Sequence, residues 1–284
     1  MPSNPLVRIL LFGIGAILIL VLAYKFLFRA EDTPGPRPKL DPAALVVGGR
    51  PELDAPAGAT DLQVVDAMLG LADVRPDDDV VDLGSGDGRI LIAAARSFGA
   101  HGLGVDIDPA QIALANDNAR AAGVAGRVTF RHEDLFQTPI ADAEVLTLYL
   151  TQEVNLRLRP RILAQMQPGA RVVSHDYDMG EWRADQRRRV GDATVYLWLV
   201  PARVEGAWLL SAGGRDVPLT LQQSFQAFTG TAGEARIEQG RLTGDRIRFV
   251  ADLGGGPQVF EGRVSGDTIA PVAANAGWRA RRAR

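Results

Sequence analysis

The chain has 284 residues, of which 46% are hydrophobic and 23% are charged, and its formal net charge is −3. This length and composition fit one full α/β domain plus something smaller, and the charge gives no indication of a nucleic-acid partner. The absence of Cys excludes disulfides and thiolate metal sites, and three scattered His disfavour a His-based metal centre, so we expect no metal.

The first stretch of the chain is strongly apolar. No residue between Ile9 and Tyr24 is charged, and if Lys25 snorkels, residues 9–28 give about 20 residues, enough to span a bilayer. The alternative is a cleaved signal peptide, but the stretch is long and no small-residue cleavage site follows it directly. We therefore expect residues 1–30 to form a single-pass anchor in the lipid bilayer. More basic residues follow the stretch than precede it, which favours the cytoplasmic side for the rest of the chain.

Residues 31–59 are rich in Pro, so we expect a semi-extended linker there. We expect the folded domain to cover residues 60–201 and to open with a helix over Thr60–Val74. Thr60 and Gln63 match a capping box, which indicates that this helix begins at Thr60.

The sequence VVDLGSGDGRI, at Val80–Ile90, organises this domain. An apolar run leads at once into a Gly-rich turn, and good helix formers follow and stop at Gly99. This order of strand, loop and helix begins a βαβ unit that binds a nucleotide-like ligand. The glycines allow a close approach of the ligand, and the helix N-terminus offers free N–H groups.

The details of the loop disfavour a dinucleotide. The third Gly of a dinucleotide fingerprint would fall on Arg89, where a long side chain obstructs close packing of helix and strand. Asp82 lies two residues before the first Gly, where a carboxylate repels a pyrophosphate but suits an ammonium group. S-adenosylmethionine carries an ammonium group and no phosphate, so an NAD-dependent oxidoreductase is disfavoured.

VDLGSGDGRI resembles the first motif of class I S-adenosylmethionine-dependent methyltransferases. This resemblance implies an α/β fold with a Rossmann-like, doubly wound sheet and S-adenosyl-L-methionine as cofactor. It also implies that Asp106, 18 residues beyond Gly88 at the end of the second strand, accepts the ribose hydroxyls. Ile107, Asp134 and Leu135 would lie beside the adenine. The implied cofactor-binding residues are Asp82, Gly84, Ser85, Gly86, Gly88, Asp106, Ile107, Asp134 and Leu135.

The methyl acceptor is expected at the ends of the fourth and fifth strands, because ligands bind at the carboxyl ends of strands in such sheets. The fourth strand is expected over Val145–Leu150, followed by a helix towards Met166. We expect Tyr149, Thr151 and Gln152 to align the acceptor. The second choices are Asp176 and Tyr177, beside His175 at the end of the fifth strand, and a last strand follows over Thr194–Val200. The alternative is that these strand-end residues serve packing only.

Three longer segments narrow the family further: VVDAMLGLADVRPDDDVVDLGSGDGRI, YLTQEVNLRLRPRIL and SHDY…TVYLWLVP. Together they resemble the membrane-anchored class I protein-lysine methyltransferases. The resemblance implies methyl transfer to a lysine amine of a protein, with a membrane protein among the expected substrates. Because the methyl group of a sulfonium is already activated, we expect no catalytic triad. The alternatives are a methyltransferase that acts on a small molecule or lipid, and a non-catalytic adenosyl-binding module.

Residues 202–284 differ in character, because turn signals recur every few residues, as in a small antiparallel β domain. Gly240–Ile247, GRLTGDRI, recurs as Gly262–Ile269, GRVSGDTI, and each predicts a hairpin that turns at Gly-Asp. We expect a β-meander or small half-barrel with a structural or partner-binding role. The basic tail and the run Arg187–Arg189 form solvated faces or contact anionic lipid.

Overall fold

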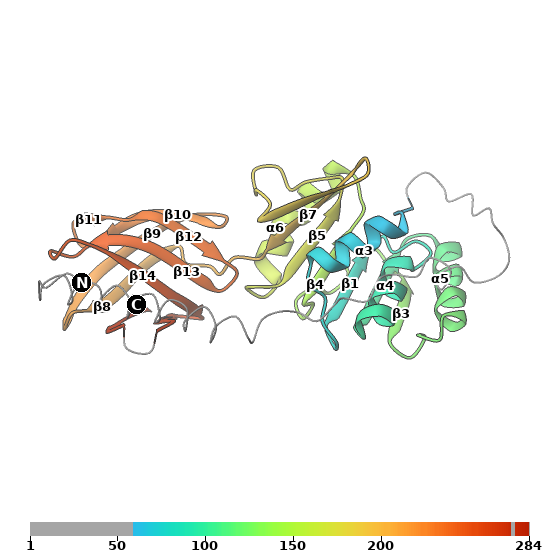
Figure 1. Cartoon of the computed structure of the whole chain (residues 1–284), viewed down its shortest axis with the longest axis horizontal. Coiled ribbons are helices and arrows are strands. Elements are labelled where there is room, and N and C mark those ends of the chain that lie inside the picture. Colours follow the sequence, from blue (N-terminus) through green and yellow to red (C-terminus); the bar gives the residue numbers. More distant parts are fainter. Residues whose placement is uncertain (1–58, 274–275, 284) are drawn as a thin grey trace, which may run out of the picture. The chain divides into compact units, whose positions relative to one another are not determined.

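The structure is a computed structural model that describes residues 59–273 and 276–283 (Figure 1). The expected anchor at 1–30 and nearly all of the expected linker at 31–59 lie outside the described residues. Among the residues that are described, no helix is both long and apolar enough to cross a bilayer.

The first domain is built on a mixed sheet, with seven strands in the described part of the chain. Its order is β3-β2-β1-β4-β5-β7-β6, and β7 runs antiparallel to both of its neighbours. The central strand β1 is buried at every position after Asp79, as a strand covered on both faces must be. The bounds are β1 Asp79–Leu83, β2 His101–Asp106, β3 Val128–His132, β4 Val145–Leu148, β5 Arg171–His175, β6 Gln186–Val190 and β7 Ala193–Leu199.

Helices cover both faces of this sheet, which confirms the expected doubly wound arrangement. Val80 packs with α3, α4 and α5 on one face, whereas Val81 packs with α6 on the other, because successive strand residues point to opposite faces. The helix bounds are α3 Leu62–Leu71, α4 Arg89–Ala93, α5 Pro109–Ala121 and α6 Gln152–Gln165, and a π-helical turn, Ala94–Phe98, continues α4.

The structure corrects two expected boundaries and adds one strand. The first helix is capped by Asp61, whose carboxylate accepts the Gln63 N–H at 2.8 Å, so the capping box at Thr60 was wrong. The fourth strand ends at Leu148 rather than Leu150, because Thr151 already caps the next helix. The run Arg187–Arg189 lies inside β6, a strand that was not expected.

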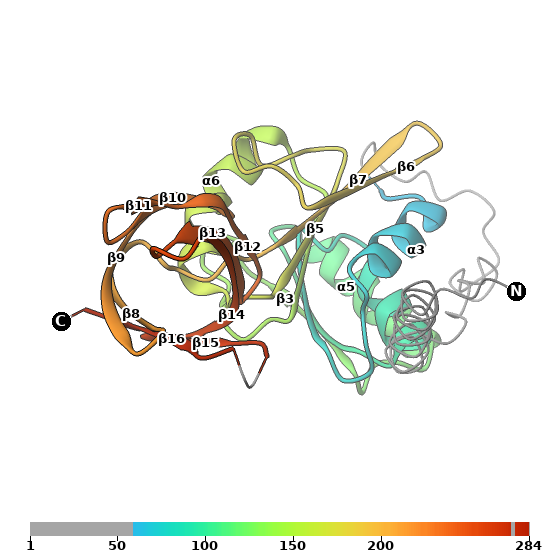
Figure 2. The ribbon, with the colours of Figure 1, turned by 60° about the vertical axis from the view of Figure 1, so that its left-hand side comes forward.

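The second domain is an antiparallel barrel rather than a half-barrel. Eight strands of the described residues follow one another as a meander, and β9 pairs with β10 while β16 pairs with β8, which closes the ring (Figure 2). The short strand β11 adds to β10. The bounds are β8 Gly206–Ala212, β9 Arg215–Ser224, β10 Ala227–Ala232, β11 Ala235–Arg236, β12 Glu238–Thr243, β13 Arg246–Asp252, β14 Pro257–Ser265, β15 Thr268–Pro271 and β16 Trp278–Arg282.

The two repeated segments form the expected hairpins. Thr243 pairs with Arg246 across Gly244-Asp245, and Ser265 pairs with Thr268 across Gly266-Asp267. Closure removes free sheet edges, so the barrel needs no partner strand to satisfy its backbone.

Candidate active site

Four parallel strands end at the same edge of the first sheet, and the expected site residues gather there. The Gly loop follows β1, Asp106 ends β2, Tyr149 follows β4 and His175 ends β5. The chain order changes direction beside β1, which is flanked by β2 and β4. This is the position at which open α/β sheets bind their ligands.

Asp82 is a buried carboxylate with half of its hydrogen-bonding capacity unused. Thr147 Oγ1 donates to its Oδ1 at 2.6 Å, whereas Oδ2 and the neighbouring Ser85 Oγ are buried without a partner among the described residues. Burial raises the pKa of Asp82 to about 7, with smaller contributions from the charges of Asp106 and Asp87. An orphaned acceptor is costly unless a ligand satisfies it, so Asp82 is poised for a cation.

The Gly loop is shaped by backbone geometry and by close packing. Gly88 has φ +81° and precedes α4, and a Cβ there would lie 2.6 Å from the ring of Phe130. Gly86 has φ +51°, but a Cβ there would meet only Gln111 Oε1, at 4.0 Å. The loop is therefore tightly packed at Gly88 and open towards a ligand at Gly86.

Arg89 stands where a dinucleotide site would have its third Gly, and here its side chain forms structural contacts. Its guanidinium pairs with Asp87 at 2.6 Å and donates to the Thr60 carbonyl at 2.8 Å. The hydrogen bond to Asp87 raises the pKa of Arg89 further. The arginine thus ties the chain before α3 to the Gly loop.

Asp106 lies against the Gly loop, and its contact with the ribose stays a prediction. Its Oδ2 accepts the Gly86 N–H and its Oδ1 accepts the Asp108 N–H, both at 2.9 Å. Each carboxylate oxygen can accept more than one hydrogen bond, and each accepts one here, so both can also accept a ribose hydroxyl. The side chain of Ile107 is 72% exposed beside it, and a flat apolar ligand would cover that surface.

Asp134 and Leu135 lie in the loop after β3. Asp134 is exposed, and its Oδ1 accepts the Phe136 N–H at 2.9 Å, while Leu135 is half-buried and packs against the core on the α6 face. Arg161 on α6 holds this loop in place, because its guanidinium donates to the Leu135 carbonyl at 3.0 Å. Their contact with adenine stays a prediction.

Tyr149 belongs to a cluster at the ends of β4 and β5, where we expect the methyl acceptor. Its ring stacks on His175 with 3.9 Å between centroids. His175 Nδ1 lies 3.3 Å from Thr60 Oγ1, and its Nε2 lies 3.3 Å from a carboxylate oxygen of Asp176. If the neutral ring carries its proton on Nε2, facing the Asp176 carboxylate, then Nδ1 accepts from the Thr60 hydroxyl. Burial lowers the pKa of His175 and raises that of Tyr149.

Thr151 and Gln152 both have structural contacts in addition to their expected role. Thr151 caps α6, accepting the Val154 N–H at 3.4 Å. The Gln152 amide donates to Asp178 Oδ1 at 2.9 Å. Alignment of the acceptor by these two residues stays a prediction.

The second-choice residues differ in their surroundings. Asp176 has φ +61°, and its Oδ1 accepts the Thr194 N–H at 2.7 Å, whereas Tyr177 is 39% exposed. Asn155 is buried nearby, donates to the Tyr177 carbonyl at 3.0 Å, and keeps an Oδ1 without a partner in the described part of the chain. The sequence could indicate His175 and Asn155 only by their proximity to strand ends.

These residues fit S-adenosylmethionine. Asp82 supplies an unpaired buried acceptor for its ammonium, the Gly loop leaves open space at Gly86, and Asp106 supplies two acceptors for its ribose. Among the described residues, no group of three or more His, Cys, Asp or Glu could hold a metal ion.

Comparisons with known proteins agree with this geometry. Residues 82–186 match the model of the ANTKMT methyltransferase domain. The chain is 38% identical to a protein-lysine N-methyltransferase of Saccharolobus islandicus over 49% of this chain and 89% of that protein. It is 30% identical to the mouse adenine nucleotide translocase lysine N-methyltransferase over 57% of this chain and 69% of that protein.

A solved structure covers the same domain. It is an RNA methyltransferase from Salinibacter ruber in complex with S-adenosyl-L-homocysteine, 51% identical, with a TM-score of 0.51. The match covers 51% of this chain and 95% of that chain.

Proposed function

Since the chain belongs to the ANTKMT-type family of protein-lysine methyltransferases, we propose that it transfers a methyl group to a lysine amine of a protein substrate. The chain is an S-adenosylmethionine-dependent methyltransferase. The structural observation that supports cofactor binding is the buried Asp82 carboxylate, whose Oδ2 has no partner among the described residues, and the lysine acceptor is supported by the relatives.

S-adenosylmethionine supplies an activated methyl group on a positively charged sulfur. Asp82, the Gly loop and Asp106 would hold it. The protein therefore has to position the acceptor amine, remove its proton and exclude water. Burial beside the stacked Tyr149 and His175 rings would lower the amine pKa, and Tyr149 Oη would accept an amine N–H.

We extend the proposal to the location of the substrate. The apolar residues 9–28 and the basic residues after them support a membrane-anchored enzyme on the cytoplasmic side, acting on a protein at or near the bilayer. If this is correct, the full chain stays in the pellet when membranes are washed with alkaline carbonate. Release into the supernatant would contradict the anchor.

RNA is the second candidate acceptor, because the Salinibacter ruber protein is an RNA methyltransferase. The net charge of −3 supports protein over RNA, since most RNA-binding surfaces are strongly basic. A small-molecule or lipid acceptor, and a non-catalytic adenosyl-binding role, are the remaining alternatives.

One labelling experiment separates these acceptors. The full chain is incubated with methyl-labelled S-adenosylmethionine and with membranes, soluble proteins and RNA from the source organism lacking its gene. We expect label that protease releases and nuclease does not. Nuclease-sensitive label would favour RNA, label extracted into organic solvent would favour a lipid, and no label at all would favour the non-catalytic role.

The sequence simplifies this assay. Lys25 and Lys39 are the two lysines of the chain, and residues 40–284 contain none, so the described domains cannot become labelled on lysine. The matched controls are Asp106→Ala, which should abolish labelling, and Asp117→Asn, an exposed carboxylate on α5 that should not change it.

A further inference from the structure

The two ends of the barrel differ, because one is packed with buried side chains and the other holds a cavity that is open to solvent. The turns after β8, β10 and β13 and the connection before β16 gather at one end, and the chain enters β8 at the opposite end. Large side chains such as Trp208, Leu242 and Ile247 fill the core towards the entry end and are fully buried. An eight-stranded barrel has an interior wide enough for packed side chains or for one small ligand.

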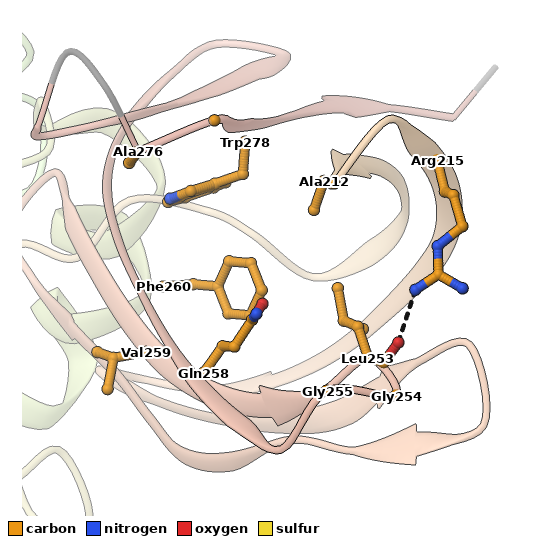
Figure 3. Close-up of a pocket in the computed structure, with 12 residues that line it drawn as sticks. Ala212, Arg215, Leu253, Gly254, Gly255, Gln258, Val259, Phe260, Ala276 and Trp278 are labelled. Carbon is orange, nitrogen blue, oxygen red and sulfur yellow. Dashed lines mark hydrogen bonds between the residues drawn. The ribbon is translucent and has the colours of Figure 1, made fainter.

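The open end contains a cavity of about 650 Å³, drawn in Figure 3. Trp278 and Phe260 form an aromatic side of this cavity, with their rings edge to face at 5.3 Å, and Ala212, the strand partner of Trp278, and Leu253 also line it (Figure 3). The volume falls within the range of about 300–1,000 Å³ that is typical of small-molecule sites.

Register shows that two polar side chains also face the lumen. Arg215 is the partner of the buried Ala212, and Gln258 is the partner of the buried Ala251, so both lie on the inner face of their strands. Both are nevertheless exposed, which means that the lumen is open to solvent at this level. A polar residue at an inward position is unusual in a barrel core and calls for a partner.

Arg215 is the charged residue among the described residues that line the cavity. It donates one hydrogen bond, to the Leu253 carbonyl at 2.7 Å, and no ion pair is found for it within residues 59–273 and 276–283. The turn between β13 and β14 also lines the cavity. It is held in shape by Asp252 Oδ1, which accepts the N–H groups of Gly254, Gly255 and Gly256 at 2.8, 3.2 and 3.0 Å.

We propose that this end of the barrel binds a small aromatic anion, with its ring against Trp278 and Phe260 and its negative group on Arg215. The site is separate from the methyltransferase site, and it does not rest on the proposed acceptor. Apolar contact provides affinity, and the inward arginine selects a negatively charged ligand through charge-assisted hydrogen bonds.

Two fluorescent probes test the proposal, because they share an apolar body and differ in one charged group. 8-Anilinonaphthalene-1-sulfonate carries a sulfonate, and N-phenyl-1-naphthylamine does not. Both should bind the full chain saturably, the sulfonate more tightly. Ala212→Trp fills the cavity and should weaken both probes by about tenfold or more. Equal binding of either probe by this variant would overturn the proposal.

Arg215→Gln tests the charge without filling the cavity. It should weaken the sulfonate about tenfold and leave the neutral probe within about twofold, since only the sulfonate loses a charge-assisted hydrogen bond. The matched control is Arg246→Gln on the outer face, next to the inward Ile247, which should change neither. An unchanged preference in Arg215→Gln, or displacement of the probes by S-adenosylhomocysteine, would contradict the assignment.

Discussion

At the scale of single residues, we expect the protonation of Asp82 to determine how cofactor binding depends on pH. Its pKa is raised to about 7 in the free protein, mainly by burial, and an ammonium group can pair only with its carboxylate form. Between about pH 4 and 7 the folded protein binds more protons here than the unfolded chain, so this residue lowers the stability of the free fold as pH rises.

Affinity for S-adenosylhomocysteine should therefore increase as pH rises from about 6 to 8, because the proton that must leave Asp82 is then already lost. Asp82→Asn should bind about tenfold or more weakly and lose this dependence. Calorimetric titration at three pH values measures both effects. If Asp82→Asn kept the pH dependence of the unmutated chain, a titratable group other than Asp82 would have to cause that dependence.

Tyr149 is the acceptor-side residue that can be tested most cleanly. Tyr149→Phe keeps the ring that stacks on His175 and removes only the hydroxyl. We expect kcat to fall about 100-fold, the lower end of the range for one catalytic hydrogen bond, while the Kd of S-adenosylhomocysteine stays unchanged. Steady-state kinetics and a binding titration separate the two quantities, and an unchanged kcat would remove Tyr149 from the acceptor site.

At the scale of elements, two glycines at helix ends separate the cost of backbone strain from the cost of overpacking a side chain. Gly88 before α4 and Gly123 after α5 have φ +81° and +73°, but only at Gly88 would a Cβ meet a neighbour, the Phe130 ring at 2.6 Å. Gly123→Ala should cost about 1 kcal/mol of unfolding free energy from backbone strain. Gly88→Ala should cost at least about 1 kcal/mol more, because overpacking adds to the strain. Urea denaturation measures the difference, and equal costs would show that Phe130 moves freely.

The elements also differ in how far they could be predicted from neighbouring residues alone. The strand, Gly loop and helix around Asp82 could be predicted because all of their determinants lie within a few neighbouring residues. The start of α3 was misplaced by two residues, since Asp61 competes with Thr60 as the cap. The strand β6 was missed because its sequence QRRRV has no apolar alternation, and its pairing with β7 defines it.

At the scale of the whole molecule, long-range contacts were the part that the sequence could not specify. The hairpins of the C-terminal domain follow from local turn residues, but barrel closure depends on pairs such as Trp278 with Ala212, which no local pattern indicates. Likewise, Thr60 and His175 meet across 115 residues. Motifs therefore identified the cofactor loop, whereas the acceptor cluster and the barrel cavity required the fold.

The most direct measurement of the central claim is the chemical identity of the methylated residue. Protein labelled by the full chain and methyl-labelled S-adenosylmethionine is hydrolysed in acid, and the amino acids are separated. We predict that the label elutes as methylated lysine and that the Asp106→Ala chain yields none. Label on any other amino acid, or labelled lysine of equal amount from Asp106→Ala, would contradict the account.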